Sequence, residues 1–472
     1  MDSEQFRRHG HDVIDWVADY LRDVERYPVL PPTRPGEIRA QLPAAPPENG
    51  EPMEQILRDF RELILPGVTH WNHPRFFAYF PANNSGPSIL GELISAALGV
   101  NAMVWQSSPA ATELEEVVMD WLRQMLGLPE AFRGVIQDTA SCATLCAILC
   151  ARERATAFRV NAEGVKGEAL RVYVSREAHS SVEKGMKIAG LGAEHLVKVG
   201  VDAALALDPA DLERRVREDR KRGYRPCCII ATVGTTSSTA LDPLEAITAI
   251  GREHDLWVHV DAAMAGSAAI LPEKRAILAG IEQADSFVFN PHKWLFTNFD
   301  CSAFFCRHPE TLIRTLAITP EYLRTGFDQQ ATNYRDWHPQ LGRRFRALKL
   351  WFVLRSYGLE EIRRKLRNHL DWTRKLAGWI ESEPDFELLA PVTVQTICFR
   401  HHPAGLDDEA ELNRRNQELI KAINATGRIF LTQTKLGGTV TLRFSLGQTN
   451  QTLAHVERAW EVVKETARGL GK

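Results

Sequence analysis

The sequence predicts an α/β protein with a mostly parallel, mixed sheet between helices, a helical arm before it and a small α+β domain after it. Over residues 81–355, apolar strand-like runs alternate with segments of helical charge pattern. Before this region, two helical stretches are joined by a proline-rich one, and after it the pattern changes again. We therefore expect three parts, comprising residues 1–80, 81–355 and 356–472.

The first 80 residues predict two amphipathic helices joined by an extended arm. Apolar residues from Phe6 to Leu21 recur at helical spacing, and the stretch MEQILRDFRELILPGV ends near Gly67. Between them, LPPTRPGEIRAQLPAAPPENGEP has too many prolines for a regular helix. Two such helices bury little apolar surface by themselves. We therefore expect another protein surface to cover their apolar faces, and a partner subunit is a candidate.

The central region predicts a sheet covered on both faces. Its clearest strands are RVYVS (171–175), CCIIATVG (227–234), LWVHVDAA (256–263), DSFVFN (285–290) and CSAFFC (301–306). Strands that are apolar throughout and separated by helices favour parallel pairing. The link between the last two is too short for a crossover helix, which predicts a mixed sheet.

The last region predicts a small α+β domain. A long basic helix, LEEIRRKLRNHLDWTRKLAGWIES, precedes the strand VQTICFR and the helix DDEAELNRRNQELIKAINATG. The runs RIFLTQT and TVTLRFSLG then read as a hairpin joined by Lys435 to Gly438, before a closing helix.

Composition narrows the class of protein. The 472 residues are 44% hydrophobic and 25% charged, with 57 Lys and Arg against 60 Asp and Glu, a net charge of −3. This balance does not favour a nucleic-acid or membrane-surface partner. Neither a secretory signal nor a membrane span is evident. The eight cysteines lack the CxxC pairs of metal sites, so we expect reduced thiols, no metal and a cytoplasmic location.

Lys293 is the strongest chemical signal. It lies just past an apolar strand, between His292 and Trp294. A lysine in apolar surroundings is costly unless it is solvated, paired or used covalently. Lysines form Schiff bases, and apolar surroundings make the amine more nucleophilic by lowering its pKa. The alternative is a lysine that reaches solvent at the strand end.

Asp261 is the second signal, at the carboxyl end of the apolar strand in HVDAAMAGSAAI. A carboxylate there can pair with a cationic ring nitrogen of a cofactor, and the small residues after it permit close approach. The alternative is an aspartate that caps the next helix.

Two further features precede these in the chain. Thr139 and Ser141 open a helical stripe, and a helix N-terminus binds phosphate, although an ordinary N-cap has the same pattern. His179 follows a strand, where its ring either stacks on a planar cofactor or is structural. Such sheets bind ligands at the carboxyl ends of their strands. In this order, the four features together predict a pyridoxal phosphate site.

The sequence closely resembles the aromatic L-amino-acid decarboxylase family, which belongs to the group II pyridoxal-phosphate-dependent decarboxylases. The resemblance extends along the chain without a major gap. The matching runs are GVTHWNHPRFFAYFP, WQSSPAATELE, GVIQDTAS, REAHSSVEK, ATVGTT, HVDAAMAGSA, NPHKWLFTNFDCSA, NYRDWHPQLGRRFRALKLWFVLRSYG and VERAWE.

This resemblance implies a fold type I enzyme that binds pyridoxal 5′-phosphate and forms a homodimer with shared active sites. It makes Lys293 the lysine that holds the cofactor covalently and Asp261 the partner of the pyridine nitrogen. His179 would stack on one ring face, opposite Ala263. The implied cofactor-binding residues are Thr139, Ala140, Ser141, His179, Thr236, Asp261, Ala263, Asn290, His292 and Lys293.

Tyr322 completes the implied catalytic set. The run TPEYLRTGFDQQATNYRD resembles the family's mobile catalytic loop, and Tyr322 falls on its proton-donating tyrosine. Relatives with Phe at this position form an aldehyde by oxidative deamination, so Tyr322 implies an amine product. The catalytic residues we expect are Lys293, His179, Tyr322 and Asp261.

The resemblance also implies a pocket for the substrate side chain. Its residues are Trp71, Tyr79, Phe80, Pro81, Ala82, Asn101, Met103, Leu341 and Gly342. Aromatic walls suit an aromatic ring. Ala82 replaces a Thr of animal members, and Asn101 and Met103 replace apolar and aromatic residues that the partner subunit contributes there. Gly342 matches a glycine that accompanies indole acceptance in plant relatives, and the preferred ring stays open among those of Trp, Tyr, DOPA and Phe.

The expected function is therefore decarboxylation of an aromatic L-amino acid to its amine and CO2. Two other enzymes remain open, an aromatic aldehyde synthase and a decarboxylase of a non-aromatic amino acid. No arginine for a distal carboxylate is evident, which argues against glutamate as the substrate. A catalytically silent dimer that binds pyridoxal phosphate is the third alternative, and the presence of all four expected catalytic residues argues against it.

Overall fold

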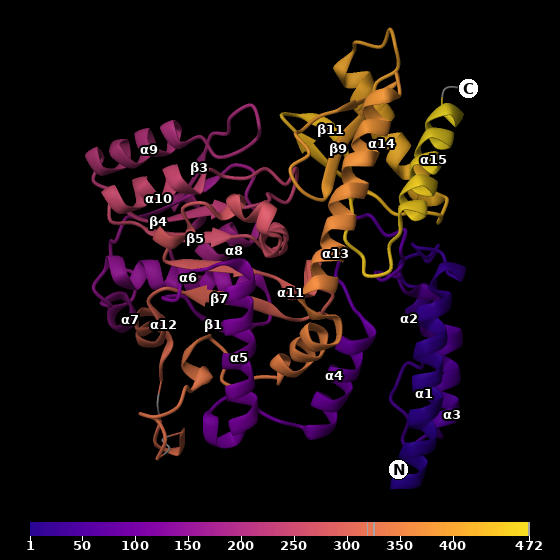
Figure 1. Cartoon of the computed structure of the whole chain (residues 1–472), viewed down its shortest axis with the longest axis horizontal. Helices are drawn as coiled ribbons and strands as arrows, with labels where there is room; N and C mark the ends of the chain where they lie inside the picture. Colours follow the sequence, from indigo (N-terminus) through magenta and orange to yellow (C-terminus); the bar gives the residue numbers. More distant parts are fainter. Residues whose placement is uncertain (319, 324–325, 471–472) are drawn as a thin grey trace. The chain divides into compact units, whose positions relative to one another are not determined.

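The computed structural model describes residues 1–318, 320–323 and 326–470, apart from the side chain of Tyr322 (Figure 1). The chain forms two compact units. Unit 1 comprises Met1–Pro81, Ser382–Glu387 and Arg400–Lys472, and unit 2 comprises Ala82–Glu381 and Leu388–Phe399. The expected three-part division, with boundaries at residues 80 and 355, stays a prediction.

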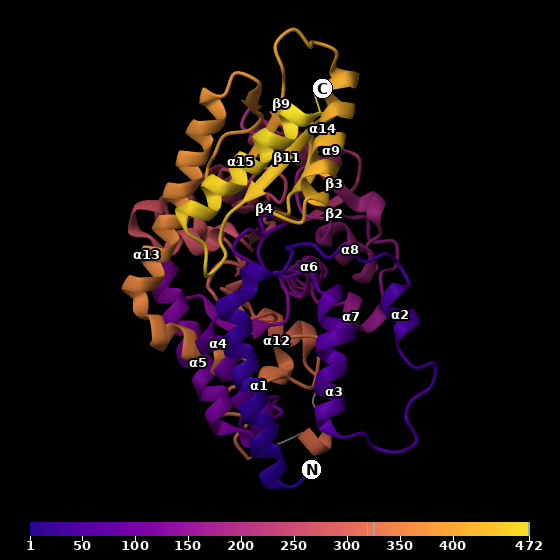
Figure 2. The same ribbon diagram turned by 90° about the vertical axis from the view of Figure 1, so that its right-hand side faces the viewer.

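Unit 1 begins with the expected helical arm. Its helices are α1 (Ser3–Asp23), α2 (Glu37–Gln41), α3 (Met53–Asp59), α14 (Glu409–Ala425) and α15 (Leu453–Gly469). Figure 2 shows α1 and α3 running alongside each other, and the rings of Trp16 and Phe60 meet edge to face at 5.1 Å. The Asp2 side chain accepts hydrogen bonds from the first turn of α1 and fixes where it begins.

The arm between these helices corrects one expectation. The proline-rich stretch was expected to lack helix, but α2 forms within it. Gly36, with a φ of 94°, reverses the chain, and the five residues after it contain no proline. The interval between two prolines is thus long enough for one helical turn.

Unit 2 contains the large sheet. Its strand order is β1-β7-β6-β5-β4-β2-β3. The strands are β1 (Arg133–Gln137), β2 (Leu170–Ser175), β3 (Leu196–Val199), β4 (Arg225–Thr232), β5 (Trp257–Asp261), β6 (Ser286–Phe289) and β7 (Ser302–Cys306). All pairs from β6 to β3 are parallel, and β7 is antiparallel to both β6 and β1. The mixed sheet and the five predicted strands are confirmed, while β1 and β3 were missed.

The helices of unit 2 cover this sheet. They are α4 (Gly86–Leu98), α5 (Pro109–Leu126), α6 (Ala140–Ala155), α7 (Val160–Glu163), α8 (Ser181–Ile188), α9 (Pro209–Lys221), α10 (Leu244–Glu253), α11 (Pro291–Trp294), α12 (Pro309–Leu316) and α13 (Arg346–Ser382). The label α13 covers two helical segments separated at Gly358, whose φ of 66° and ψ of 167° are not helical, so the long basic helix expected after Gly358 is confirmed.

Strand β5 shows that α6 and α10 lie on opposite faces of the sheet. The imidazole of His259 lies 3.4 Å from the Thr144 hydroxyl of α6, whereas a Cβ placed on Gly251 of α10 would meet Val258. Neighbouring residues of a strand point to opposite faces. Asp261, two residues after His259, therefore shares the face that α6 covers.

The smaller sheet has the strand order β10-β11-β9-β8. Its strands are β8 (Phe386–Leu388), β9 (Thr396–His401), β10 (Thr432–Leu436) and β11 (Thr439–Ser445). The predicted hairpin is confirmed with a shorter loop, because β10 continues to Leu436 and only Gly437 and Gly438 turn the chain. Both glycines have positive φ, as a two-residue hairpin turn requires.

The interior agrees with two sequence expectations. The eight cysteines, all within the described residues, are free, and seven of them are buried. Cys146 and Cys150 lie on the face of α6 that packs into the core of unit 2. None of the helices in the described part of the chain is long and apolar enough to span a lipid bilayer.

Candidate cofactor site

The carboxyl ends of five strands of unit 2 lie along one edge of the sheet. Strands β2, β4, β5 and β6 run in the same direction, and two antiparallel pairings give β1 that direction again. Each is followed by a residue set that the sequence singled out, as Figure 1 allows the reader to trace. This edge is where open α/β sheets bind ligands.

Asp261 ends β5 and is buried, with 6% of its surface exposed. Its Oδ1 accepts a hydrogen bond of 3.0 Å from the N–H of Ala263. Within the described residues, Oδ2 makes no hydrogen bond. A buried carboxylate with a free oxygen is costly in the bare protein and suits a cationic N–H donor.

The loop after β6 is joined to the loop after β5. The N–H of Asn290 donates to the carbonyl of Ala263 over 3.0 Å, and the Ser302 hydroxyl donates to Oδ1 of Asn290 over 2.7 Å. These bonds fix the segment that leads into α11, which carries Lys293. Asp261 and Lys293 are therefore positioned by neighbouring strands and by one shared hydrogen-bond network.

The backbone around Lys293 is anchored on both sides. The Asn83 amide donates to the Lys293 carbonyl over 2.9 Å, and the indole N–H of Trp294 donates to Nδ1 of His369 over 3.0 Å. Lys293 itself is half-buried, while Trp294 is fully buried. The side chain of Lys293 thus extends from a rigid backbone.

His292 is a neutral donor in this loop. Burial, followed by the charge of Lys293, lowers the pKa of His292 to about 3. Its Nδ1 accepts a hydrogen bond of 2.9 Å from the N–H of Cys301. A neutral imidazole that accepts at Nδ1 carries its proton at Nε2, so this nitrogen can donate to a ligand.

The N-terminus of α6 follows β1 at the same edge. Thr139 is its N-cap, and the Thr139 hydroxyl accepts from the N–H of Cys142. Among the described residues, the N–H groups of Ala140 and Ser141 have no acceptor, as expected for the first residues of a helix. Two free N–H groups at a helix N-terminus match the needs of a phosphate.

His179 follows β2, at the start of α8. Its Nδ1 lies 2.8 Å from the Ser181 hydroxyl and accepts from the Ser181 N–H over 3.2 Å. Desolvation lowers the pKa of His179, the charge of Asp261 raises it, and that of Lys293 lowers it again. Both charges act on this ring, so His179 lies near Asp261 and Lys293, although the residue is exposed in the bare chain.

The loop after β4 contains a hydroxyl cluster that the sequence did not single out. The hydroxyls of Thr235 and Ser238 are 3.1 Å apart, and the Thr235 hydroxyl accepts from the N–H of Ala240. Thr236, which was singled out, is half-buried within this loop. At the preceding Gly234, a Cβ would come within 2.5 Å of Ala265, so only glycine fits there. The loop is held close to the segment that follows Asp261.

The donors and acceptors of this edge fit pyridoxal phosphate. Free helix N–H groups and the Nε2–H of His292 suit its phosphate, and the free oxygen of Asp261 suits its ring nitrogen. A lysine on a rigid backbone suits its aldehyde. The individual roles of these residues stay predictions.

The expected substrate-pocket residues lie in both units. Trp71, Tyr79, Phe80 and Pro81 belong to unit 1, and Ala82, Asn101, Met103, Leu341 and Gly342 belong to unit 2. In unit 1 the rings of Trp71 and Tyr79 stack, with centroids 5.6 Å apart, and both side chains are exposed. The guanidinium of Arg443 lies 5.3 Å from the centre of the Phe80 ring.

Three of the pocket residues of unit 2 form a cluster. Oδ1 of Asn101 accepts from the N–H of Arg343 over 3.0 Å, and its Nδ2 lies 3.6 Å from the Met103 sulfur. A Cβ placed on Gly342 would lie 3.9 Å from the same Nδ2. Asn101 and Gly342 are exposed neighbours although about 240 residues separate them. It stays a prediction that Asn101 and Met103 contribute to the substrate pocket of the partner subunit.

Tyr322 belongs to the short 3-10 turn Glu321–Leu323. Its side chain lies outside the described residues, so its predicted role as proton donor is not placed. The sequence did not predict Asn83, because nothing in FAYFPANN marks it apart from the capping serine two residues later. His369, in a helix far along the chain, gave no signal.

Comparison with known proteins adds independent observations. Residues 35–402 match the family model described as the pyridoxal-dependent decarboxylase conserved domain. The chain is 43% identical to tyrosine decarboxylase 4 of Petroselinum crispum, over 100% of this chain and 94% of that protein. It is 42% identical to phenylacetaldehyde synthase of Arabidopsis thaliana, over 100% and 97%.

A solved structure agrees over the whole chain. The crystal structure of Oryza sativa TDC with PLP and tryptamine superposes with a TM-score of 0.97 at 36% identity, covering 100% of this chain and 99% of that one. The match confirms the fold type I expectation and the cofactor expected from the residues at the sheet edge.

Proposed function

The chain belongs to the pyridoxal-dependent decarboxylase family, and from this premise we propose that it converts an aromatic L-amino acid to the corresponding amine and CO2. The observation that carries the proposal is the set of groups at one sheet edge: a buried carboxylate, an anchored lysine and free phosphate donors. The relatives named for tyrosine and for tryptamine support an aromatic side chain. The exposed stack of Trp71 and Tyr79 supports it as well.

When bound, pyridoxal phosphate supplies a conjugated ring that accepts the electron pair left on Cα as CO2 departs. The residues of this chain make that possible. Asp261 holds a proton on the ring nitrogen and so keeps the ring electron-poor. Ala140, Ser141, Asn290 and His292 hold the phosphate.

Three further side chains act around the reacting carbon. Lys293 would hold the cofactor through Nζ, and its amine is the group that the substrate amine would replace. His179 covers one face of the ring and excludes water from it. Tyr322 delivers the proton that replaces the carboxylate at Cα, so that an amine is formed.

Mass spectrometry of products tests the proposal. Purified protein with added pyridoxal phosphate is offered L-Trp, L-Tyr, L-DOPA, L-Phe, L-His and L-Glu in separate reactions. We expect amine and CO2 from at least one of the four aromatic substrates. Amine from L-Glu or L-His alone would overturn the aromatic assignment, and no product from any of them would overturn the decarboxylase.

The aldehyde-forming alternative has support in the 42% identity to phenylacetaldehyde synthase. Tyr322 decides between the two outcomes. We expect Tyr322→Phe to divert the product from amine to aldehyde, because a ring without a hydroxyl cannot protonate Cα. Dissolved O2 would then oxidise the unprotonated carbon, and hydrolysis would release the aldehyde and ammonia, with hydrogen peroxide as the reduced product. Unchanged amine output from this variant would remove Tyr322 from the mechanism, and aldehyde from the unaltered chain would replace the proposed reaction.

We also propose that the protein is a cytoplasmic homodimer. Helix α4 leaves Leu90, Leu93, Ile94 and Leu98 exposed at helical spacing, and α1 leaves Phe6, Val13 and Ile14 exposed. Apolar stripes of this kind favour burial against a second copy. Free cysteines support a reducing compartment. Light scattering during size-exclusion chromatography should give twice the mass of the chain, and the mass of one chain would contradict the dimer.

A further inference from the structure

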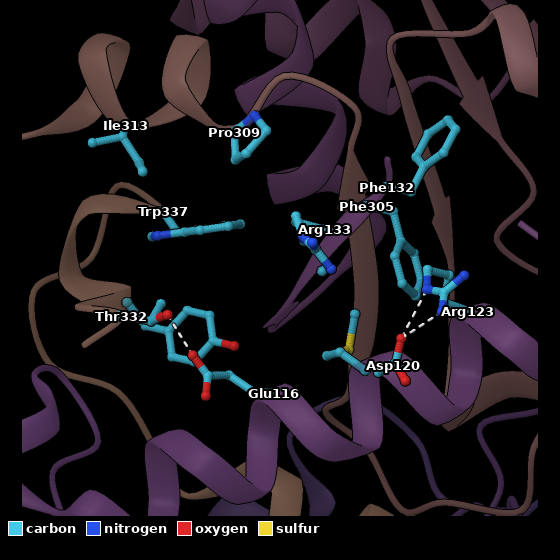
Figure 3. A pocket seen from close by; sticks show the side chains of 13 residues that line it. Glu116, Asp120, Arg123, Phe132, Arg133, Phe305, Pro309, Ile313, Thr332 and Trp337 are labelled. Atoms are coloured by element: carbon cyan, nitrogen blue, oxygen red, sulfur yellow. Dashed lines mark hydrogen bonds and ion pairs between the residues drawn. The ribbon is translucent and has the colours of Figure 1, made fainter. Parts of the chain in front are cut away.

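A cavity of about 350 Å³ lies beside the edge strand β1 of unit 2, away from the residues assigned to the cofactor (Figure 3). Its walls come from helix α5, strands β1 and β7, helix α12, Trp337, and Thr332 and Tyr334 near the end of the proposed catalytic loop. Its volume is in the range of small-molecule sites, about 300–1,000 Å³. Among its described lining residues, none belongs to the cofactor or substrate sets.

Aromatic rings form much of the wall. Trp337 and Tyr334 meet edge to face with centroids 5.7 Å apart, and Phe132 and Phe305 lie toward the strand side of the cavity. Figure 3 shows the Trp337 indole on one side and the two phenylalanines on the other. Phe132, Phe305 and Tyr334 are almost fully buried, so the indole of Trp337, which is 8% exposed, is the aromatic surface that a ligand ring can reach.

Two opposite charges in the cavity form no ion pair among the described residues, although the charge of Arg133 contributes to lowering the pKa of Asp120. Arg133, at the start of β1, is exposed, and in the described part of the chain its guanidinium makes neither a hydrogen bond nor an ion pair. Glu116, on α5, accepts a hydrogen bond from the Thr332 hydroxyl but has no cation within the described ranges. The other carboxylate, Asp120, is already bound by Arg123 at 2.7 Å.

We propose that this cavity is a second, non-catalytic binding site for a zwitterionic aromatic α-amino acid. The Arg133 guanidinium binds the carboxylate, Glu116 binds the ammonium group, and the side-chain ring packs against Trp337. An arginine fork matches a carboxylate, and a carboxylate matches an ammonium group. A ligand that carries both charges and a ring uses all three features of the wall, whereas a simple anion uses only Arg133.

The choice of probe follows from the proposed function, because the chain would meet such amino acids as substrates. The experiment therefore has to separate the cavity from the catalytic site. Sodium borohydride treatment of the holoenzyme fixes the cofactor on Lys293 and stops turnover. L-Phenylalanine is then titrated into this full-length protein by isothermal calorimetry, alongside three variants treated identically.

We expect saturable binding of one L-phenylalanine per chain at the cavity. Arg133→Gln and Glu116→Gln should each weaken it about tenfold or more, because each removes one charge-assisted contact. Arg222→Gln is the matched control: Arg222 is an exposed arginine at the end of α9, outside the cavity, and should leave the affinity unchanged. Since Arg133 and Glu116 are exposed, their variants should melt at the same temperature as the unaltered chain.

Two fragments of the ligand test the requirement for both charges. Phenylacetate lacks the ammonium group and phenethylamine lacks the carboxylate, so each should bind about tenfold more weakly than L-phenylalanine. Equal binding of either fragment, or unchanged binding by Arg133→Gln or by Glu116→Gln, would overturn the proposal. Failure of the proposed function is seen separately, in the product analysis of the untreated holoenzyme, which does not depend on binding at the cavity.

Discussion

Asp261, Asn290 and His292 are each less than a tenth exposed, whereas Ser141, His179, Asn101 and Gly342 are exposed. The first three, which we call the buried group, are held by backbone hydrogen bonds between neighbouring strand ends. The other four, the exposed group, lie on loops or at a helix start. The sheet itself therefore organises the buried residues proposed to contact the cofactor, while the exposed residues proposed for the cofactor and the substrate are set by loops and a helix start and remain open to a ligand.

The largest expected effect belongs to the lysine beside the buried group. Lys293→Ala should lower amine formation by about a thousandfold or more, because no other described group replaces its covalent role. The visible absorbance of the covalently held cofactor should disappear. Lys221→Ala, an exposed lysine of α9, is the control and should retain both properties. Persistent absorbance in Lys293→Ala would show that another residue holds the cofactor.

Asp261→Asn tests the buried group directly. The amide oxygen can still accept from the N–H of Ala263, so the fold should persist, while the negative charge is lost. We expect amine formation to fall about a hundredfold, comparable to the removal of one preorganised electrostatic contact. The ratio of kcat in the two proteins measures it. Activity within a factor of about two of the unaltered chain would mean that Asp261 is only a structural cap.

Acid should destabilise the strands beneath the buried group. Burial lowers the pKa of His259 to about 4. The unfolded residue, with a pKa near 6.5, binds more protons than the folded one, so stability falls as the pH drops from 6.5 toward 4. At pH 5 this histidine alone accounts for a loss of about 2 kcal/mol in the free energy of unfolding.

Urea unfolding at pH 7 and pH 5 measures this loss. In His259→Gln the decrease between the two pH values should be smaller than in the unaltered chain, because the titrating group is gone. His11→Gln, at an exposed position of α1, is the control and should show the full decrease. An equal decrease in all three proteins would mean that His259 is not the group that titrates.

The smallest effect is expected in the exposed group. Gly342→Ala adds a methyl group at van der Waals distance from Asn101 Nδ2, at 3.9 Å, without backbone strain. We expect kcat/KM for L-Trp to fall about fivefold relative to L-Tyr, since small changes in a pocket wall shift discrimination modestly. Gly378→Ala, in open space on α13, is the matched control. An unchanged ratio would remove Gly342 from the substrate pocket.

Much of the buried group was predictable because it follows strands that are apolar throughout. Asp261 ends β5, Asn290 and His292 follow closely after β6, and hydrophobic periodicity predicts both strands. Strand β1 was not predicted, because it begins with Arg133 and Gly134 and only its last three residues are buried. Strand β3 was not predicted, because it has four residues, of which only the last is buried.

The contacts within the exposed group could not be predicted from the sequence. No spacing rule brings Asn101 to Gly342, since their contact depends on how two distant loops fold over α5 and β1. The same holds for Trp294 and His369, which meet through a helix 75 residues further along. Contacts made by loops and by long-range helix packing produce no hydrophobic periodicity in the sequence.

The anchoring of Lys293 by Asn83 and by the Trp294–His369 pair has a kinetic consequence. With the backbone fixed, only the flexible stem of the lysine moves, and its amine stays within one side-chain length of the sheet edge. A tethered reactant of this kind has a very high effective concentration. In the role proposed for Lys293, the return of this amine to the cofactor would therefore be a first-order event, whose rate is independent of how dilute the enzyme is.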